Sequence, residues 1–401
     1  MNEVNNIPEG WVETTLGEVV TFQRGFDLPT TNRTTGNFPL MVSNGQDGTH
    51  NEFKVKAPGV VTGRSGSLGN VYFVNKNFWP LNTTLWVKDF YNNDVKFVYY
   101  FLKTFPFEKY NSGSGVPTLN RNHIHPITII FPKDLSEQKS IADILTSFDD
   151  KIELLQAQNK TLEELAQTLF KEWFGKYKVG DELPEGWRVG KLEEVIEFIN
   201  GYAFKSNDIL NEPEIETLKV FKMGDIKKGG GFNPSKTKSY FRKKDAKKLS
   251  KYILRNGDLL MCMTDMKDAI SLLGHTALMI YDDEYIVNQR VGLIRAKNDI
   301  NISYPYLYLL TNEANFISDL RGRSNSGVQV NLSTEAIKQS NIVIADKDTN
   351  LKFNIIVKPL FDKVKTNTEQ IQTLTKTRDA LLPKLMSGEI RVKKQFFENF
   401  E

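Results

Sequence analysis

Two long stretches of the chain carry apolar residues at alternating spacings of four and three. We call each such series of residues a seam. The first seam consists of Ile141, Leu145, Phe148, Ile152, Leu155, Asn159, Leu162, Ala166, Leu169 and Trp173. The second consists of Phe353, Val357, Leu360, Val364, Asn367, Ile371, Leu374, Arg378, Leu381 and Leu385. This heptad pattern predicts two long coiled-coil helices, over residues 136–175 and 351–388. Asp134 and Glu137 offer a capping box at the first helix. Pro359 is expected near the true start of the second helix and Pro383 at a kink.

Each seam contains one asparagine, and the two asparagines predict how the helices pair. In an antiparallel pair, facing residues have numbers with a constant sum. Asn159 with Asn367 and Leu155 with Ile371 both give 526, so one register satisfies both pairs. A buried Asn pair costs stability but fixes register and orientation. The alternative is that each helix packs separately on its own domain.

Charge favours the paired arrangement. Residues 136–174 hold eight acidic and four basic side chains, a net charge of −4. Residues 352–386 hold three acidic and seven basic side chains, a net charge of +4. Opposite charges attract the helices modestly and in a salt-dependent way.

Outside the helices, short apolar runs separated by Gly, Asn and Pro predict β-strands. They lie at residues 60–61, 71–74, 84–87, 127–131, 219–221, 258–261, 276–280, 291–294 and 342–344. Short helices are expected at residues 97–107 and 304–319. Each region is therefore expected to be an α+β domain with a strongly curved, mostly antiparallel sheet.

The order of these features occurs twice. Ile7-Pro8-Glu9-Gly10-Trp11 recurs as Leu183-Pro184-Glu185-Gly186-Trp187, and similar features follow each copy. The fold prediction is two similar β-rich domains joined by two long antiparallel helices with pseudo-two-fold symmetry. The predicted boundaries are 1–135 (first domain), 136–175 (central helix), 176–350 (second domain), 351–388 (C-terminal helix) and 389–401 (tail).

Composition narrows the function classes. The chain has 401 residues, a net charge of +3 and one cysteine, Cys262, which excludes a disulfide framework and fits a reducing cytosol. No signal peptide or membrane-spanning run is visible, so a cytoplasmic location is expected. Between Lys219 and Lys251 lie twelve Lys/Arg and two Asp/Glu. This run is either a solvated loop or a surface that faces phosphates.

No catalytic pattern is convincing. Residues 62–67 are glycine-rich but lack the lysine of an ATP-binding loop. His123 and His125 would point the same way on a strand, yet two histidines without further ligands make a poor metal site. We therefore expect a binding protein without cofactor, metal or catalytic residues.

The helix ends carry a family resemblance. Residues 165–174 read LAQTLFKEWF and residues 381–390 read LLPKLMSGEI. Together with the repeated Pro-Glu-Gly-Trp starts, they resemble the specificity subunit of type I restriction–modification systems. The resemblance implies a non-catalytic DNA reader in bacterial defence, with each globular domain acting as a target recognition domain for half of a bipartite, asymmetric site. It also implies two methyltransferase (modification) subunits docked on the helices, with restriction subunits joining afterwards.

Matching loops provide the candidate DNA-binding residues. The base-reading candidates are Arg64, Ser65, Ser67, Asn82, Thr83, Ser112 and Ser114 in the first domain, and Thr264, Asp265, Lys267, Gln289, Arg290, Arg323 and Asn325 in the second. Arg suits guanine, and Asn or Gln suits adenine. The phosphate-binding candidates are Lys236, Lys238, Arg242, Lys243 and Lys244, and Lys222 is a further DNA-binding candidate. For any one of these, a plain turn or solvated loop is an equally good interpretation.

The half-sites are expected to differ and to lie about one turn of DNA apart. Adding one heptad to each helix should add about 10 Å, or about three base pairs of spacer. Two alternatives remain open: a coiled-coil adaptor that binds only proteins, and an enzyme with an unrecognised site. Steep salt dependence of duplex binding argues against the first, and activity of the lone chain with magnesium or S-adenosylmethionine would support the second.

Overall fold

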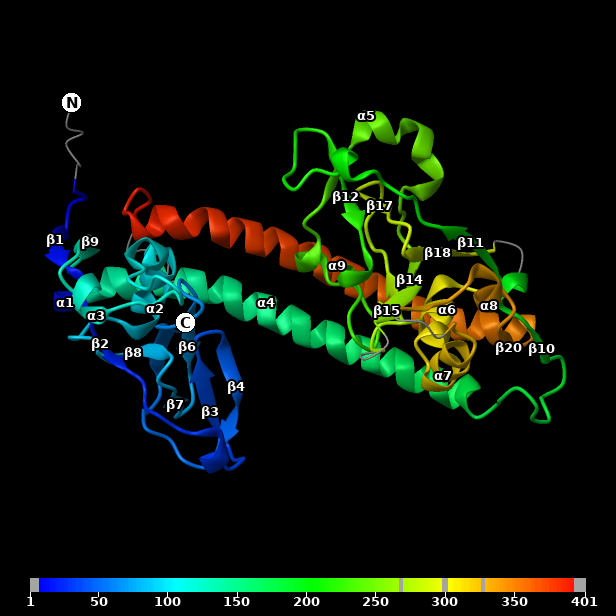
Figure 1. The fold of residues 1–401 in the computed structure, drawn as a ribbon, viewed down its shortest axis with the longest axis horizontal. Helices are drawn as coiled ribbons and strands as arrows, with labels where there is room; N and C mark the ends of the chain where they lie inside the picture. The colour runs from blue at the N-terminus through cyan, green and yellow to red at the C-terminus, as the bar shows by residue number, and fades with distance from the viewer. Residues whose placement is uncertain (1–6, 267–269, 298–301, 326–328, 393–401) are drawn as a thin grey trace, which may run out of the picture. The chain divides into compact units, whose positions relative to one another are not determined.

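A computed structural model describes residues 7–266, 270–297, 302–325 and 329–392. The chain forms two compact units (Figure 1). The first unit comprises Met1–Leu155 and Glu369–Glu401, and the second comprises Gln156–Thr368. Both combine helices with small, mostly antiparallel sheets, as the α+β prediction required.

The first unit is built on a four-stranded sheet in the order β2-β8-β5-β6. Two smaller sheets, β4-β3-β7 and β1-β9, complete it, and β3 with β7 is a parallel pair. Its strands are β1 (Trp11–Thr15), β2 (Thr21–Arg24), β3 (Phe38–Val42), β4 (Gly45–His50), β5 (Gly59–Gly63), β6 (Val71–Val74), β7 (Trp79–Pro80), β8 (Thr84–Asp89) and β9 (Thr128–Pro132). Its short helices are α1 (Leu16–Val19), α2 (Val95–Thr104) and α3 (Arg121–Ile124).

The second unit repeats this plan. Its four-stranded sheet has the order β11-β18-β14-β16, beside the sheets β13-β12-β17, β10-β20 and β15-β19. Its strands are β10 (Arg188–Lys191), β11 (Ile196–Asn200), β12 (Thr217–Phe221), β13 (Tyr240–Arg242), β14 (Leu259–Cys262), β15 (Thr264–Met266), β16 (Thr276–Leu278), β17 (Tyr285–Val287), β18 (Val291–Ala296), β19 (Gln329–Asn331) and β20 (Asn341–Ile344). Its short helices are α5 (Lys243–Ala246), α6 (Tyr304–Thr311), α7 (Ala314–Gly322) and α8 (Thr334–Lys338).

The single helix predicted over residues 304–319 is divided into α6 and α7. The division falls where Asn312 turns its side-chain amide to the backbone and hydroxyl of Thr276. Glu313 then caps α7 by accepting hydrogen bonds from the N–H groups of Asn315 and Phe316. A local capping residue therefore divides the helix, although the apolar pattern is continuous.

The two long helices are α4 (Leu135–Phe170) and α9 (Lys347–Met386). A short π-helical turn, Lys171–Gly175, follows α4. Helix α9 begins well before Pro359, so the prediction of a start at Pro359 is wrong. The proline lies on an exposed face next to Ile355, whose carbonyl loses its usual N–H partner and can be solvated instead. Burial of Phe353 and Val357 in the core of the second unit holds the earlier turns helical.

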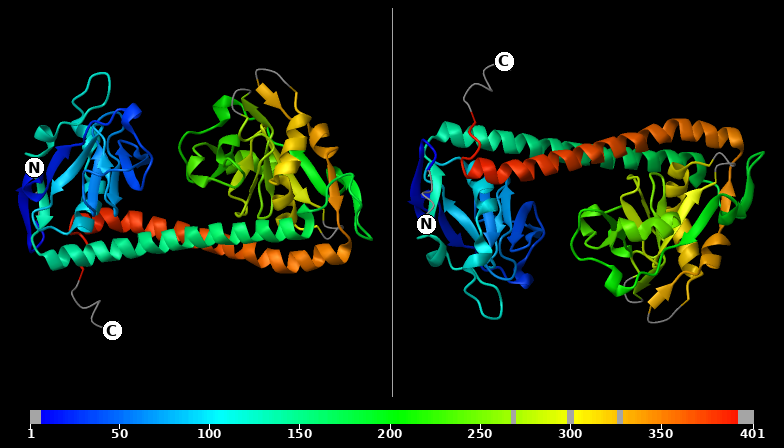
Figure 2. Two further views of the ribbon diagram at one scale, coloured as in Figure 1. Left: turned by 90° about the horizontal axis from the view of Figure 1, so that it is seen from below. Right: turned by 90° about the horizontal axis from the view of Figure 1, so that it is seen from above.

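Within each unit, one segment of α4 packs antiparallel to one segment of α9. In the first unit, Ile141 and Leu145 share a buried core with Leu385, against which the partly buried Leu381 packs, and Figure 2 shows the two segments side by side. In the second unit, Ala166 and Phe170 share a core with Phe353 and Val357. Leu385 and Leu381 are the residues that the sum of 526 places opposite Ile141 and Leu145, and both lie in or against this core.

The repeated Pro-Glu-Gly-Trp motif has a structural role in each unit. Gly10 and Gly186 both have φ near +79°. The backbone N–H of the tryptophan that follows each glycine donates to the carbonyl of the motif's proline at 3.0 Å, which closes a tight turn. The indole of Trp11 donates to Glu137 at the start of α4 (3.2 Å). The indole of Trp187 donates to Asp346 just before α9 (3.0 Å). The motif thus anchors the start of each long helix.

This anchoring revises the predicted capping box of α4. Asp134 does accept a hydrogen bond from the N–H of Ser136 at 2.9 Å. The carboxylate of Glu137, however, accepts from Trp11 and from the guanidinium of Arg391 (2.9 Å). Glu137 therefore ties the helix start to two distant segments.

Candidate nucleic-acid interface

Three loops meet at one end of the sheet in the first unit. The N–H of Arg64 donates to the carbonyl of Thr83 at 2.8 Å, and the carbonyl of Arg64 accepts from Leu119 at 2.8 Å. Ser65 forms a β-bridge with Thr118, and Ser112 donates its backbone N–H to the same Thr118 at 2.8 Å. We call residues 64–67, 82–83 and 112–118 the first loop cluster. Every predicted base-reading residue of the first domain lies in it.

The second unit brings the corresponding loops together with the same hydrogen bonds. The N–H of Met263 donates to the carbonyl of Arg290 at 3.2 Å, and the carbonyl of Met263 accepts from Leu332 at 2.9 Å. The hydroxyl of Thr264 donates to the side chain of Asn331 at 2.9 Å. We call residues 263–266, 288–290, 325 and 329–332 the second loop cluster.

The shared backbone pattern defines which residues correspond. Asn325 donates its N–H to the carbonyl of Asn331 at 3.2 Å, as Ser112 does to Thr118. The counterpart of Ser112 is therefore Asn325, and Arg323 lies two residues before the cluster, at the end of α7.

The predicted base readers differ in how free their side chains are. In the second cluster, Gln289 and Arg290 are exposed. In the first, Ser112 and Ser114 are exposed, whereas the Arg64 guanidinium donates to the carbonyl of Asn82 at 3.3 Å. Gln289, Arg290 and Ser114 are thus exposed to a ligand, whereas the Ser112 hydroxyl already donates to the carbonyl of Thr118 at 3.0 Å.

Three further residues of the first cluster are partly enclosed. Ser65, Ser67 and Thr83 are half-buried, and the Thr83 hydroxyl is buried without a hydrogen-bond partner. Asn82 donates its side-chain amide to Asp27. These side chains are therefore less accessible to a ligand than Ser112 and Ser114.

Asp265 does not fit the base-reading prediction. Its side chain is buried and accepts hydrogen bonds from the N–H groups of Met266, Ser271, Leu272 and Leu273. Burial alone would raise the pKa of this carboxyl, but the four donors hold the pKa below its usual value. Asp265 therefore organises the loop. Lys267 lies outside the described residues.

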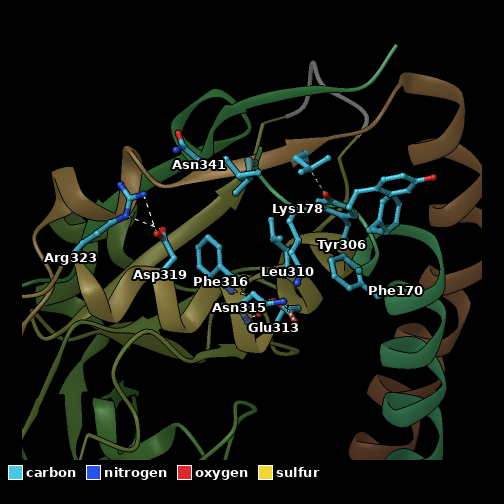
Figure 3. A pocket seen from close by; sticks show the side chains of 16 residues that line it. Phe170, Lys178, Tyr306, Leu310, Glu313, Asn315, Phe316, Asp319, Arg323 and Asn341 are labelled. Atoms are coloured by element: carbon cyan, nitrogen blue, oxygen red, sulfur yellow. Dashed lines mark hydrogen bonds and ion pairs between the residues drawn. The ribbon is translucent and has the colours of Figure 1, made fainter. Parts of the chain in front are cut away.

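Arg323 lies at the rim of an aromatic pocket in the second unit (Figure 3). The pocket measures about 300 Å³ and is lined by Phe170, Tyr306 and Phe316, among others. The guanidinium of Arg323 donates to both carboxylate oxygens of Asp319, at 2.9 and 3.3 Å. This ion pair reduces the charge that Arg323 can offer to DNA.

The lysine-rich run of the second unit is mostly solvent-exposed. Lys222, Lys236, Lys238, Lys243 and Lys244 are exposed, and Lys222 donates to the hydroxyl of Ser239 at 2.7 Å. Arg242 differs because its guanidinium forms a bidentate pair with Glu214, at 2.8 and 2.9 Å. This pairing lowers the pKa of Glu214, so the carboxylate stays charged and matches the arginine.

Sequence reasoning missed three cations in the first unit. Arg24, Lys88 and Arg121 line a groove of about 580 Å³ beside β2. No run of charge marks them, because they come from three separate segments. The only signal in the sequence was the comparison of the two repeats. Arg24 and Arg121 occupy the positions of two uncharged residues, Asn200 and Thr334, in the other copy.

Each unit has a polar layer where the long helices meet. In the second unit, fully buried Asn367 donates its amide to Asn159 Oδ1 and to Gln158 Oε1, both at 2.8 Å. Asn159 and Asn367 thus face each other, as the register required. In the first unit, Asp149 accepts from Arg378 and from the Tyr100 hydroxyl, each at 2.6 Å. These contacts orient the helices without any reactive group.

Within the described residues, no group of three or more His, Cys, Asp or Glu side chains could hold a metal ion. Over the same part of the chain, no helix is long and apolar enough to cross a membrane. Cys262 is buried, and burial raises the pKa of its thiol to about 12. A thiol with so high a pKa is a poor nucleophile.

Two curated proteins are similar in sequence. The specificity subunit of the type I restriction enzyme MjaIX of Methanocaldococcus jannaschii is 28% identical over 74% of this chain and 69% of its own. The specificity subunit of the type I restriction enzyme HindI of Haemophilus influenzae is 25% identical over 70% of this chain and 72% of its own.

The fold is also that of a solved structure. A type I restriction–modification S subunit from M. genitalium matches with a TM-score of 0.63 and 19% identity, over 96% of this chain and 98% of that one. Residues 8–164 and 184–376 both match the type I restriction modification DNA specificity domain. The chain, which carries this domain twice, belongs to the family of type I restriction–modification specificity subunits.

Proposed function

We propose that this chain is the DNA-reading, non-catalytic subunit of a type I restriction–modification complex. The observation that carries the proposal is the repeated loop cluster: two copies of one domain gather corresponding loops by the same backbone hydrogen bonds. The loops differ in sequence, with Arg64-Ser65 in one and Met263-Thr264 in the other. Each cluster would therefore read a different half of a bipartite site.

The side chains suggest which residues would read bases and which would hold the DNA backbone. Exposed polar groups of the clusters, such as Gln289 and Arg290, suit hydrogen bonds to base edges. Exposed lysines such as Lys243 suit phosphates and carry no sequence information. Residues 1–135 and 176–350 would then be the two target recognition domains.

The long helices would bind the modification subunits. Large apolar side chains stay exposed on them: Leu154 (61%), Leu165 (46%), Ile355 (65%) and Ile356 (45%). Ile355 and Ile356 are consecutive in α9, and neighbouring exposed apolar side chains on a helix are typical of protein interfaces. The partners would supply the methyl transfer, and restriction subunits would join the same assembly.

The test is to map DNA methylation in a host carrying this chain with its modification subunits, and in the same host with the chain deleted. We expect one asymmetric, two-part motif to lose methylation on deletion and to regain it when the chain is restored. Methylation that persists at every motif after deletion would refute the proposal, provided that the modification subunits are still expressed.

A further inference from the structure

The first unit has a basic groove that is assembled only by folding. It lies beside β2, an edge strand of the four-stranded sheet, and measures about 580 Å³. Arg24 ends β2, Lys88 lies in β8 and Arg121 begins α3, and all three are exposed. Asp27 is the acidic residue of the lining. The groove therefore carries a net charge of +2.

The contacts of these cations leave their charge available. Arg121 donates to the carbonyl of Phe22 at 3.3 Å, which positions its guanidinium without neutralising it. Arg24 lies 3.5 Å from Asp27, but both side chains are more than half exposed, so solvent weakens this ion pair.

The groove is continuous with the first loop cluster. Asp27 accepts a hydrogen bond from Asn82, and the carbonyl of Asn82 accepts from Arg64 at 3.3 Å. The N–H of Gly25, in the groove wall, donates to the carbonyl of Thr84 at 3.1 Å. A strand of DNA whose bases meet the loop cluster would therefore pass close to these cations.

Two of the three cations have no charged counterpart in the second unit, and the third, Lys88, corresponds to Arg295, whose guanidinium is paired with Asp258 at 2.8 Å. Gly201 donates to the carbonyl of Val291 as Gly25 does to Thr84, so Asn200 corresponds to Arg24. Thr334, the first residue of α8, corresponds to Arg121 and donates its hydroxyl to Asn200 at 2.9 Å. A neutral hydrogen bond thus replaces two guanidinium groups, and that unit has its lysine run instead.

From this contrast we infer that the groove of Arg24, Lys88 and Arg121 binds phosphodiester groups of the DNA strand read by the first loop cluster. Guanidinium and ammonium groups are the usual partners of phosphate oxygens. The three residues position the duplex and do not select bases. The inference rests on the proposed function and adds that the two domains hold the backbone with different elements.

The test is the salt dependence with which the full-length chain binds a random-sequence DNA duplex. The slope of log K against log salt is negative, and each lost phosphate contact should make it shallower by about 0.9. The variant Arg24→Gln/Lys88→Gln should therefore have a slope that is shallower by about 1.8. Arg121 is kept because it also contacts Phe22. Lys76→Gln is the matched control, since exposed Lys76 follows β6 at the opposite edge of the same sheet.

The outcomes separate the groove from the proposed function. An unchanged Lys76→Gln slope together with a reduced slope for the double variant supports the groove. Wild-type slopes in the double variant, or an equal loss per charge in Lys76→Gln, refute it while leaving DNA binding intact. Failure of the wild-type chain to bind duplex DNA in a salt-dependent way would overturn the proposed function itself.

Discussion

Replacing the buried asparagine pair should make the protein more stable while removing the feature that sets its helix register. Asn367 is fully buried, and its amide nitrogen donates to Asn159 and Gln158. Its own carbonyl oxygen is buried without a partner. The pair thus combines good hydrogen bonds with an unpaired polar atom.

The magnitudes nearly cancel. Three neutral hydrogen bonds, counting that of the Asn159 amide to the Thr368 hydroxyl, contribute about 1.5–4.5 kcal/mol together, and one buried unpaired carbonyl costs about 1–3 kcal/mol. Leucine at both positions removes both effects and buries apolar surface, which contributes about 1.5–3 kcal/mol for a fully buried side chain. We expect Asn159→Leu/Asn367→Leu to raise the free energy of unfolding by about 1 kcal/mol. The single Asn367→Leu should gain less, because the side-chain oxygen of Asn159 loses its donor.

Urea unfolding followed by the helical circular dichroism signal measures these differences. Thr161→Leu is the control, because it adds the same side chain on an exposed part of α4 and should leave stability within about 0.5 kcal/mol. A double variant less stable than the wild type would show that the asparagines stabilise the pair, and it would refute the view that they are retained for register.

Four further outcomes are expected. Trp187→Phe should lower the free energy of unfolding by about 1 kcal/mol through loss of the hydrogen bond to Asp346, whereas Trp173→Phe should cost less; equal losses in urea unfolding would contradict this. Burial and Arg121 lower the pKa of His125, which accepts from the Phe22 N–H, so its stabilisation is complete above about pH 6.5 and is lost as pH falls; His125→Gln should show a shallower loss of stability between pH 7.5 and 5.5, and an equal slope would disprove the assignment. Lys243→Gln should lower the salt slope of duplex binding by about 0.9, and Arg242→Gln by less because Glu214 already neutralises it. Ile355→Ser/Ile356→Ser should weaken co-purification with the modification subunits without reducing helical content, and undiminished co-purification would place the docking surface elsewhere.

Local patterns predicted the helices and their register well. A heptad seam is visible in consecutive residues, and the pair Asn159 and Asn367 alone distinguished one register from the others. The start of α9 was misplaced because Pro359 lies on a solvated face, where the loss of one N–H is tolerated, while burial of Phe353 extends the helix backwards.

The loop clusters were found because apolar strands mark their edges, but the roles of single side chains were not visible. Asp265 looked like a polar loop residue, and only the fold shows it capping four N–H groups. Likewise, Arg24, Lys88 and Arg121 are isolated cations in sequence and become a groove only when β2, β8 and α3 pack together. Such long-range assembly has no periodicity to detect.

The central claim, that each unit reads its own half of one DNA site, is tested most directly by mapping the methylated motif after changing one loop cluster only. The variant is Gln289→Ala/Arg290→Ala, in which both side chains are exposed and the backbone contacts of the cluster remain. We predict that one half of the motif becomes relaxed or altered while the other half and the spacer stay the same. A change in both halves, or an unchanged motif, would contradict the account.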